Sequence, residues 1–411
     1  MRVFFLVEGS GYRIHTAPDD RRYTLPNAAA MTAEAVLPKL HSPNTGNIIH
    51  REALARIVKC DPRASSLSGL PNLRNPEPGA MDAPIEQLNA SYDALVLSFA
   101  NIIERHPPSQ PIDMDDPAST RLRNLAEVVR RFRGKVFSFG MGIQVKIKSD
   151  LGLLHPALRD LLEAVNAHAE IMGVRGPETA AWLHEVGLTK AVTLGCPSLF
   201  VNPAATLSIK PAVVNGRTRY TTAGRLTRLG MKRDRLQPLL RMAQRCDLDY
   251  VYQNDVLFKR EYLTDDVPYN YLTGELDYDK LSARERDITG QAPVFKRHFL
   301  FNNADIWRGY ATGRDAYIGD RFHGGVVFLQ AGRPAGFVCC DARVRELTTY
   351  LGLEAFTLKQ VMKSTPKRML GQVNDGLPKF RRSYQAALET FMATCEGAGL
   401  PLVYDGESLR L

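Results

Sequence analysis

The segment after the apolar run Ala316–Ile318 carries the residue types best suited to chemistry on an anionic substrate. Arg321 and His323 follow this run, and Gly324 and Gly325 then open an apolar helical pattern. Residues two apart in an extended chain face the same way, so both side chains could point into one cleft. Histidine can transfer protons near neutral pH, and arginine can stabilise negative charge. A structural histidine is the alternative, but the strand-to-helix position favours a functional one.

A second candidate cation is Arg175. It follows the apolar run Ile171–Val174 and precedes Gly176 and Pro177, and proline suits the first turn of a helix. This places Arg175 at the carboxyl end of a strand, where open α/β sheets bind ligands. An arginine there can hold a carboxylate or a phosphate through two parallel hydrogen bonds. An ordinary surface arginine is the alternative.

Residues 44–50 form a small, polar segment that contains Gly46, Asn47 and His50 and leads into an apolar-periodic stretch, 51–58. The pattern predicts a loop delivered to a helix N-terminus. Free N–H groups at such an end attract anions and sugar hydroxyls. An ordinary helix cap explains the segment equally well.

A second glycine-containing loop follows the strand-like run Lys135–Phe139 and includes Gly140, Gly142 and Gln144. Its two glycines would let the backbone approach a ligand. The third glycine of a dinucleotide fingerprint is missing, and no helical pattern follows directly, so the signal for a nicotinamide cofactor is weak.

Other common chemistries lack their motifs. None of the six cysteines forms a Cys-x-x-Cys pair, and no Gly-x-Ser-x-Gly or Gly-Lys-Ser/Thr motif is present. Asp277 and Asp279 lie two apart in a polar segment rather than after a clear strand, and no histidine spacing matches a metal site. The sequence therefore predicts no metal.

The elements that must position these residues alternate between strand-like and helical patterns, which predicts a doubly wound parallel α/β fold. Helical spacing occurs in 122–132, 158–165 and 182–186, and a long final helix has its apolar face from Phe380 to Cys395. The predicted strands are Val3–Val7, Ala94–Leu97, Lys135–Phe139, Ile171–Val174, Ala191–Leu194, Asp249–Tyr252, His298–Phe301, Ala316–Ile318 and Ala335–Cys339.

Length and charge narrow the class of partner. The 411 residues suggest two or three domains, and 53 basic against 44 acidic residues favour anionic ligands. The stretch from Lys210 to Arg245 holds Asp234 as its only acid and predicts either a solvated basic linker, the basic wall of a cleft, or a patch that faces anionic lipid. No run approaches the length of a membrane span.

Four motifs, taken in their order along the chain, resemble those of the polysaccharide pyruvyl transferase family. They are the Gly46-Asn47 loop, Gly140-x-Gly142-x-Gln144, Val174-Arg175 before a helix, and Arg321-Phe322-His323-Gly324 with the later Gly332-Arg333-Pro334. The resemblance implies two facing Rossmann-like domains of the GT-B type. Residues 1–208 would form the acceptor side, 209–375 the donor side, and 376–411 a C-terminal helical segment that packs back.

The resemblance also implies an activity, which is transfer of a pyruvyl group from phosphoenolpyruvate to two hydroxyls of one sugar as a cyclic ketal, with no metal or nicotinamide cofactor. His323, Arg321 and Arg175 would be catalytic, Gly324, Gly325 and Arg343 would bind the donor, and Gly46, Asn47, His50, Gly140, Gly142 and Gln144 the acceptor. The chain departs from the family at Cys196 and Asn47, where an acid is usual, and at Arg343, where a lysine is usual.

The partners implied are phosphoenolpyruvate and a sugar acceptor, free or lipid-linked, in the biosynthesis of a bacterial surface polysaccharide, and no nucleic acid. We expect a cytoplasmic enzyme, with contact to the inner face of the cell membrane as a further expectation. The alternatives are a GT-B glycosyltransferase that uses a nucleotide sugar and a non-catalytic protein that binds glycan or lipid.

Overall fold

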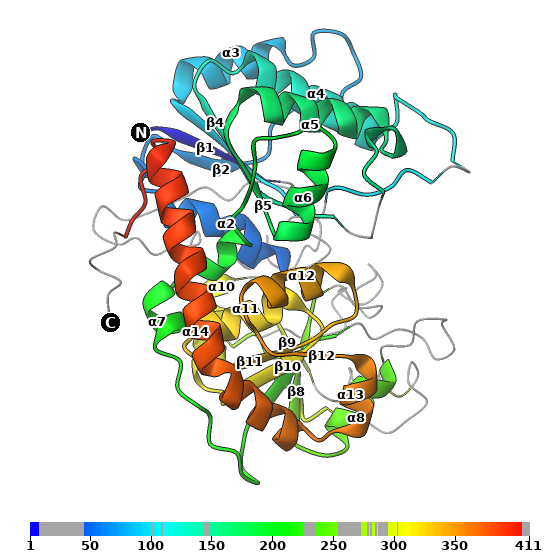
Figure 1. Cartoon of the computed structure of the whole chain (residues 1–411), viewed down its shortest axis with the longest axis vertical. Helices are drawn as coiled ribbons and strands as arrows, with labels where there is room; N and C mark the ends of the chain where they lie inside the picture. Colours follow the sequence, from blue (N-terminus) through cyan, green and yellow to red (C-terminus); the bar gives the residue numbers. More distant parts are fainter. Residues whose placement is uncertain are drawn as a thin grey trace.

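A computed structural model of the chain describes residues 1–7, 45–100, 102–107, 110–143, 148–224, 236–253, 273–277, 279, 282–283, 286, 295–301 and 303–404. Two lobes, each built on one sheet, are stacked along the long axis of the molecule, and the last helix runs beside both of them (Figure 1). Among the described residues, none of the helices has the length and apolar character needed to cross a membrane.

The first lobe contains a six-stranded parallel sheet with the order β2-β1-β3-β4-β5-β6. Its central strands are apolar and buried on both faces, as expected for a parallel sheet covered by helices. The strands are β1 (Val3–Leu6), β2 (Ser66–Ser68), β3 (Ala94–Ser98), β4 (Lys135–Met141), β5 (Ala169–Val174) and β6 (Ala191–Thr193).

Proline at the first turn starts most helices of this lobe. At α4, for example, the Asp116 carboxylate also accepts a hydrogen bond from the Ala118 N–H at 2.8 Å. The helical elements are α2 (Asn47–Ile57), α3 (Asp82–Ser91), α4 (Pro117–Arg131), η1 (Leu151–Leu153), α5 (Pro156–His168), α6 (Pro177–Glu185), η2 (Pro197–Phe200) and α7 (Pro203–Leu207).

The second lobe contains another six-stranded parallel sheet, with the order β12-β11-β10-β7-β8-β9. Its strands are β7 (Tyr220–Thr222), β8 (Leu248–Tyr252), β9 (Arg297–Leu300), β10 (Ala316–Gly319), β11 (Ala335–Val338) and β12 (Ala355–Phe356). Its helices are α8 (Leu236–Ala243), α10 (Ala304–Thr312), α11 (Phe322–Gln330), α12 (Ala342–Tyr350), α13 (Leu358–Lys363) and α14 (Pro366–Gly397).

The predicted fold class is confirmed, and all nine predicted strands are present. Three strands were not predicted: β2 and β7 are short and largely polar, and β12 has only two residues. The last helix begins at Pro366, before the predicted segment 376–411, because the Thr365 side chain caps it and Pro378 lies inside it without ending it. The strands of the two sheets lie on either side of residue 208, and the predicted domain bounds stay a prediction.

One continuous apolar core joins the two lobes. It includes side chains of β1 and α2 in the first lobe and of α11 and α14 in the second. The Phe391 ring of α14 lies 4.9 Å from that of Phe200 and 5.8 Å from that of Phe139, between ring centroids. The Tyr384 hydroxyl of the same helix donates to the Leu199 carbonyl at 2.8 Å. The final helix therefore packs back on the first lobe, as predicted.

A partly buried ion-pair network with the buried Glu52 at its centre also joins the lobes. Glu52 and Arg56 lie on α2 of the first lobe, and Asp305 and Arg308 lie on α10 of the second. Arg56 Nε is 2.9 Å from Glu52 Oε2, and Arg56 Nη2 is 2.6 Å from Asp305 Oδ2. Arg308 pairs with Glu52 and, at 2.9 Å, with Asp305. Glu52 is 9% exposed, so two guanidiniums depend on a carboxylate that water hardly reaches.

Replacing Glu52 by glutamine should lower the free energy of unfolding by about 2 kcal/mol, because it leaves two largely covered guanidiniums with only the more exposed Asp305 as a negative partner. The matched control is Asp93→Asn, which breaks the exposed Arg2–Asp93 pair and should cost far less. Urea denaturation of both variants measures the difference. Equal losses would show that the network between the lobes contributes no more than a surface ion pair.

Candidate active site

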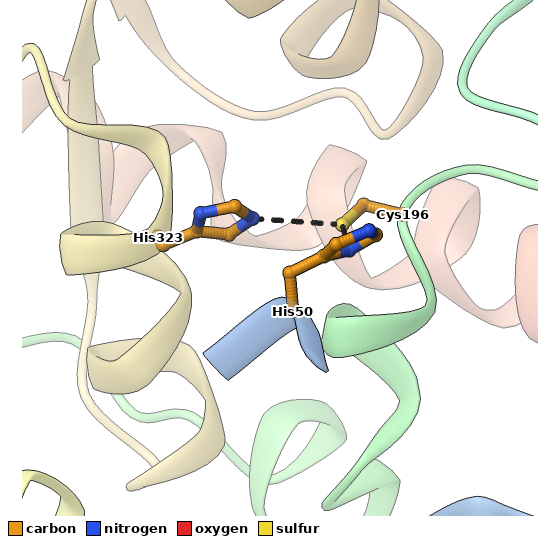
Figure 2. A group of neighbouring side chains, drawn as sticks. All are labelled: His50, Cys196 and His323. Carbon is orange, nitrogen blue, oxygen red and sulfur yellow. Dashed lines mark hydrogen bonds between the residues drawn. The ribbon is translucent and has the colours of Figure 1, made fainter. Parts of the chain in front are cut away.

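Three nucleophilic or basic side chains from distant parts of the chain meet at the junction of the lobes (Figure 2). His50 comes from α2, Cys196 from the loop after β6, and His323 from the first turn of α11. The Cys196 Sγ atom is 3.4 Å from His50 Nδ1 and 3.8 Å from His323 Nε2. The two imidazole rings are nearly parallel, with centroids 5.7 Å apart. Both lobes therefore contribute to the cluster.

The hydrogen bonds of His50 define its tautomer. Its Nε2 atom lies 2.6 Å from the Phe99 carbonyl oxygen, which can only accept, so Nε2 carries the proton. The Nδ1 atom then presents a lone pair to Cys196, and the thiol donates to it. The Ser98 hydroxyl lies 3.1 Å from Nε2, and the Ser198 hydroxyl lies 3.0 Å from the Cys196 sulfur. Cys196 is thus held from both sides.

The ring of His50 fits because residue 140 is a glycine. Gly140 has a φ of +80°, and a Cβ atom there would lie 2.4 Å from the Phe99 carbonyl oxygen and 2.8 Å from His50 Cε1. Just before α2, the Thr45 N–H donates to the Gln253 carbonyl at 3.2 Å, which joins the N-terminal end of this helix to the second lobe. These contacts explain why a helix of the first lobe presents His50 to α11.

Burial keeps both imidazoles neutral. It lowers the pKa of His50 from 6.5 to about 3, and the nearby charge of Arg175 adds to the shift. The pKa of His323 is also lowered well below its ordinary value, by burial first and then by His50, Arg175 and Arg343. His323 is partly exposed as a residue, although its ring is surrounded by protein. Two neutral bases therefore stand beside fixed positive charge.

Two arginines supply that charge. Arg175 is 4% exposed at the end of β5, and its pKa is lowered by burial and by Arg343 and raised by Cys196, Glu346 and Asp341. It remains cationic, because an ordinary guanidinium has a pKa above 12. Arg343, in the first turn of α12, lies 2.7 Å from the Asp341 carboxylate. Arg175 and Arg343 lie close enough to His323 for their charges to lower its pKa, and the roles predicted for them stay predictions.

Glu346 of α12 adds a second link between the lobes at this site. Its Oε1 atom accepts from the Thr179 N–H at 2.7 Å, and its Oε2 atom accepts from the Thr179 hydroxyl at 3.1 Å. The carboxylate caps α6, which starts two residues after Arg175. Gly176 makes room for it, since a Cβ there would lie 2.3 Å from Glu346 Cγ. The second lobe thus holds the loop that carries Arg175.

The structure places Arg321 differently from the prediction that it lies beside His323 in extended chain. The helix begins at Phe322, so Arg321 and His323 are not two residues apart in an extended strand. The Arg321 Nε–H donates to the Gly224 carbonyl at 2.8 Å, and its guanidinium lies 3.8 Å from Asp320. Arg321 therefore ties the start of α11 to the loop after β7, and its catalytic role stays a prediction.

The structure of the segment around Gly46 also differs from the predicted loop. The helix begins at Asn47 rather than at Arg51, so Asn47 and His50 belong to its first turn and Gly46 is its N-cap. Asn47 and His50 line a cavity of about 1350 Å³ at the carboxyl ends of β1 and β3. The described lining also includes Arg51 and Arg121, but not Arg175, Cys196 or His323.

The other predicted glycines have packing roles in the structure. A Cβ at Gly324 would lie 2.9 Å from the Tyr317 hydroxyl, and one at Gly325 would lie 2.4 Å from the Phe337 ring. The Gly325 N–H donates to the Arg321 carbonyl at 3.3 Å. The Gly142 carbonyl accepts from the Ile103 N–H at 3.2 Å. Gln144 lies outside the described residues, as does Arg225 to Arg235 of the basic stretch.

Cys196 is the site residue that sequence reasoning missed. Its signal was its place directly after the predicted strand that ends at Leu194, the same kind of position that singled out Arg175. An isolated cysteine carries no motif, and the two histidines it contacts are more than a hundred residues away in the sequence.

The pH dependence of stability tests the neutral state of His50. Its pKa is about 3 folded and 6.5 unfolded, so between these values the unfolded chain binds one more proton and stability falls as the pH falls. The slope from this group is about 1.4 kcal/mol per pH unit. His50→Asn should reduce the slope of unfolding free energy against pH by about this amount, measured from about pH 6 down to about pH 4.5.

Ser98→Ala is the control for that measurement, because it removes a neighbour of the ring but no titrating group. It should leave the slope unchanged. An unchanged slope in His50→Asn would mean that His50 is protonated in the folded protein.

Gly140→Ala tests the packing against His50. The left-handed φ and the contact with the Phe99 carbonyl should lower the free energy of unfolding by at least about 1 kcal/mol. A methyl group added at Gly371 on α14 would meet no neighbour within 4 Å, so Gly371→Ala should leave stability the same or higher. Thermal unfolding compares the two, and a neutral Gly140→Ala would contradict the tight contact.

Comparisons with known proteins identify a family. Solved structures that match include Anabaena HepE with UDP and glucose (TM-score 0.42, 9% identity, 96% of this chain and 95% of that one). Another is Staphylococcus aureus MnaA with UDP (TM-score 0.42, 11% identity, 88% and 95%). No curated protein matches the sequence. A family model described as polysaccharide pyruvyl transferase matches residues 44–338, and the chain therefore belongs to the polysaccharide pyruvyl transferase family.

Proposed function

We propose that the protein transfers a pyruvyl group from phosphoenolpyruvate to two hydroxyls of one sugar, forming a cyclic ketal. The observation that carries this proposal is the position of His323 at the junction of two lobes in a chain of this family, close enough to Arg175 and Arg343 for their charges to lower its pKa. A proton acceptor next to fixed cations is the combination that this substrate needs.

The charges of the site match those of phosphoenolpyruvate, which carries a phosphate and a carboxylate. Arg175 is buried, so its attraction to an anion is weakly screened by water. Arg343 is partly exposed and can meet the second anionic group. Guanidiniums bind both kinds of group through paired hydrogen bonds.

The reaction balances without a redox partner. One sugar hydroxyl oxygen bonds to the enol carbon of phosphoenolpyruvate, and the methylene carbon gains a proton and becomes a methyl group. The bond from the former enol carbon to the phosphate oxygen then breaks, and phosphate leaves with the electron pair. The second hydroxyl bonds to the same carbon. One hydroxyl proton ends on the methyl group, and the other leaves with phosphate.

His323 is the residue we assign to proton transfer. Because its ring is neutral in the free protein, it can accept the proton of the attacking hydroxyl. Bound phosphate and carboxylate groups would raise its pKa and help it to hold that proton. His50 has its Nε2–H engaged with the Phe99 carbonyl and its Nδ1 with Cys196, so it positions its neighbours. The cavity lined by Asn47 and His50 is the proposed acceptor site.

Incubation with phosphoenolpyruvate and candidate oligosaccharides tests the proposal. Mass spectrometry should show that the mass of the glycan increases by that of one pyruvyl group, and one inorganic phosphate should be released per ketal formed. His323→Ala should lower the rate by at least about 100-fold, the usual contribution of an acid–base group. His168→Ala, which changes an exposed histidine at the end of α5, should retain activity.

Turnover of a nucleotide sugar in place of phosphoenolpyruvate would contradict the proposed donor and support a glycosyltransferase. Full activity of His323→Ala would contradict the assigned proton transfer even if the pyruvyl gain is found.

A further inference from the structure

We propose that His50, Cys196 and His323 form a binding site for one divalent transition-metal ion of the zinc class. Their ligand atoms, two imidazole nitrogens and one thiol sulfur, all lie within 4.8 Å of one another. This proposal concerns metal binding and does not rest on the proposed transfer reaction.

The spacing of the three atoms suits a tetrahedral ion. Zinc lies about 2.3 Å from a thiolate sulfur and about 2.0 Å from an imidazole nitrogen, which separates nitrogen from sulfur by about 3.6 Å at a tetrahedral angle. The observed separations from the Cys196 sulfur are 3.4 Å to His50 Nδ1 and 3.8 Å to His323 Nε2. The two nitrogens lie within 4.8 Å of each other, so an ion bound to both would draw the two rings closer together.

The hydrogen bonds around His50 are those of a ready ligand. Its Nε2–H donates to the Phe99 carbonyl at 2.6 Å, which leaves the Nδ1 lone pair directed at the cluster. Histidines that bind metals usually donate the other ring N–H to a carbonyl or a carboxylate in this way. The ring is also fixed by Gly140 behind it.

The donor atoms indicate the class of metal. One thiolate and two imidazoles favour zinc over magnesium or calcium, which prefer oxygen ligands. Three protein ligands also leave one position for water or an anion, as in catalytic rather than structural zinc sites.

The charges near the cluster limit its affinity for a metal ion. Arg175 and Arg343 oppose a further cation, whereas the carboxylates of Asp341 and Glu346 lie close enough to Arg175 to raise its pKa. On binding, Cys196 would lose its thiol proton to solvent, and the thiolate would offset one positive charge. The lone pair of His323 cannot bind a metal and accept a proton at once, so a bound ion would inhibit the proposed reaction.

The test is direct titration of the full-length, chelator-treated protein with Co²⁺, followed by displacement with Zn²⁺. We expect one Co²⁺ to bind per chain. Its absorption spectrum should show a thiolate-to-cobalt charge-transfer band and the visible bands of tetrahedral cobalt. Cys196→Ser should abolish the charge-transfer band, and His323→Ala should weaken Zn²⁺ binding by more than about tenfold. Circular dichroism confirms that each variant is folded.

Cys395→Ser is the matched control, because Cys395 is another buried thiol and lies outside the cluster. It should keep the band and the affinity. A wild-type protein without the band, or a band that persists in Cys196→Ser, would overturn the proposed site. Since binding is measured without substrate, neither outcome depends on whether phosphoenolpyruvate is the donor.

Discussion

A carboxylate buried between two guanidiniums determines how the two lobes meet. Glu52 belongs to the first lobe, and it pairs with Arg56 of its own helix and with Arg308 of the second lobe. Such a group is stable away from water only while its partners stay in place. The pairing therefore holds α2 against α10. His50 is on the same helix, so this contact helps to place it opposite His323.

The junction built in this way has an unusual electrostatic balance. Two imidazoles, one thiol and two guanidiniums lie together, and burial together with the guanidiniums keeps the imidazoles neutral. Carboxylates from α12 and its N-cap partly balance the arginines. A site with fixed positive charge and neutral bases can attract an anion and accept a proton. It can also offer lone pairs to a soft cation, and the thiol of Cys196 is the ligand that allows this second use.

Strand and helix patterning predicted the fold well because long apolar runs and prolines at first helical turns are local signals. Very short strands such as β7 gave no such signal. Pro378 lies inside α14, and the sequence therefore did not indicate the first part of that helix. The site was predicted less completely. Arg175 and His323 stand at strand ends and could be found from the sequence. The orientation of Arg321 could not, because it depends on the carbonyl of Gly224 in another strand-end loop. Cys196 had only its place after a strand as a signal, and its part in the site becomes clear once two distant histidines lie beside it.

The neutral state of both His50 and His323, where the lobes meet, is the property on which the proposed chemistry depends. Titration of the histidine ring nitrogens by ¹⁵N NMR tests it most directly, with the two residues assigned through single substitutions. We expect that neither ring gains a proton as the pH is lowered from about 8 to about 5, whereas an ordinary histidine titrates near 6.5. Protonation of either ring close to 6.5 would contradict the neutral site.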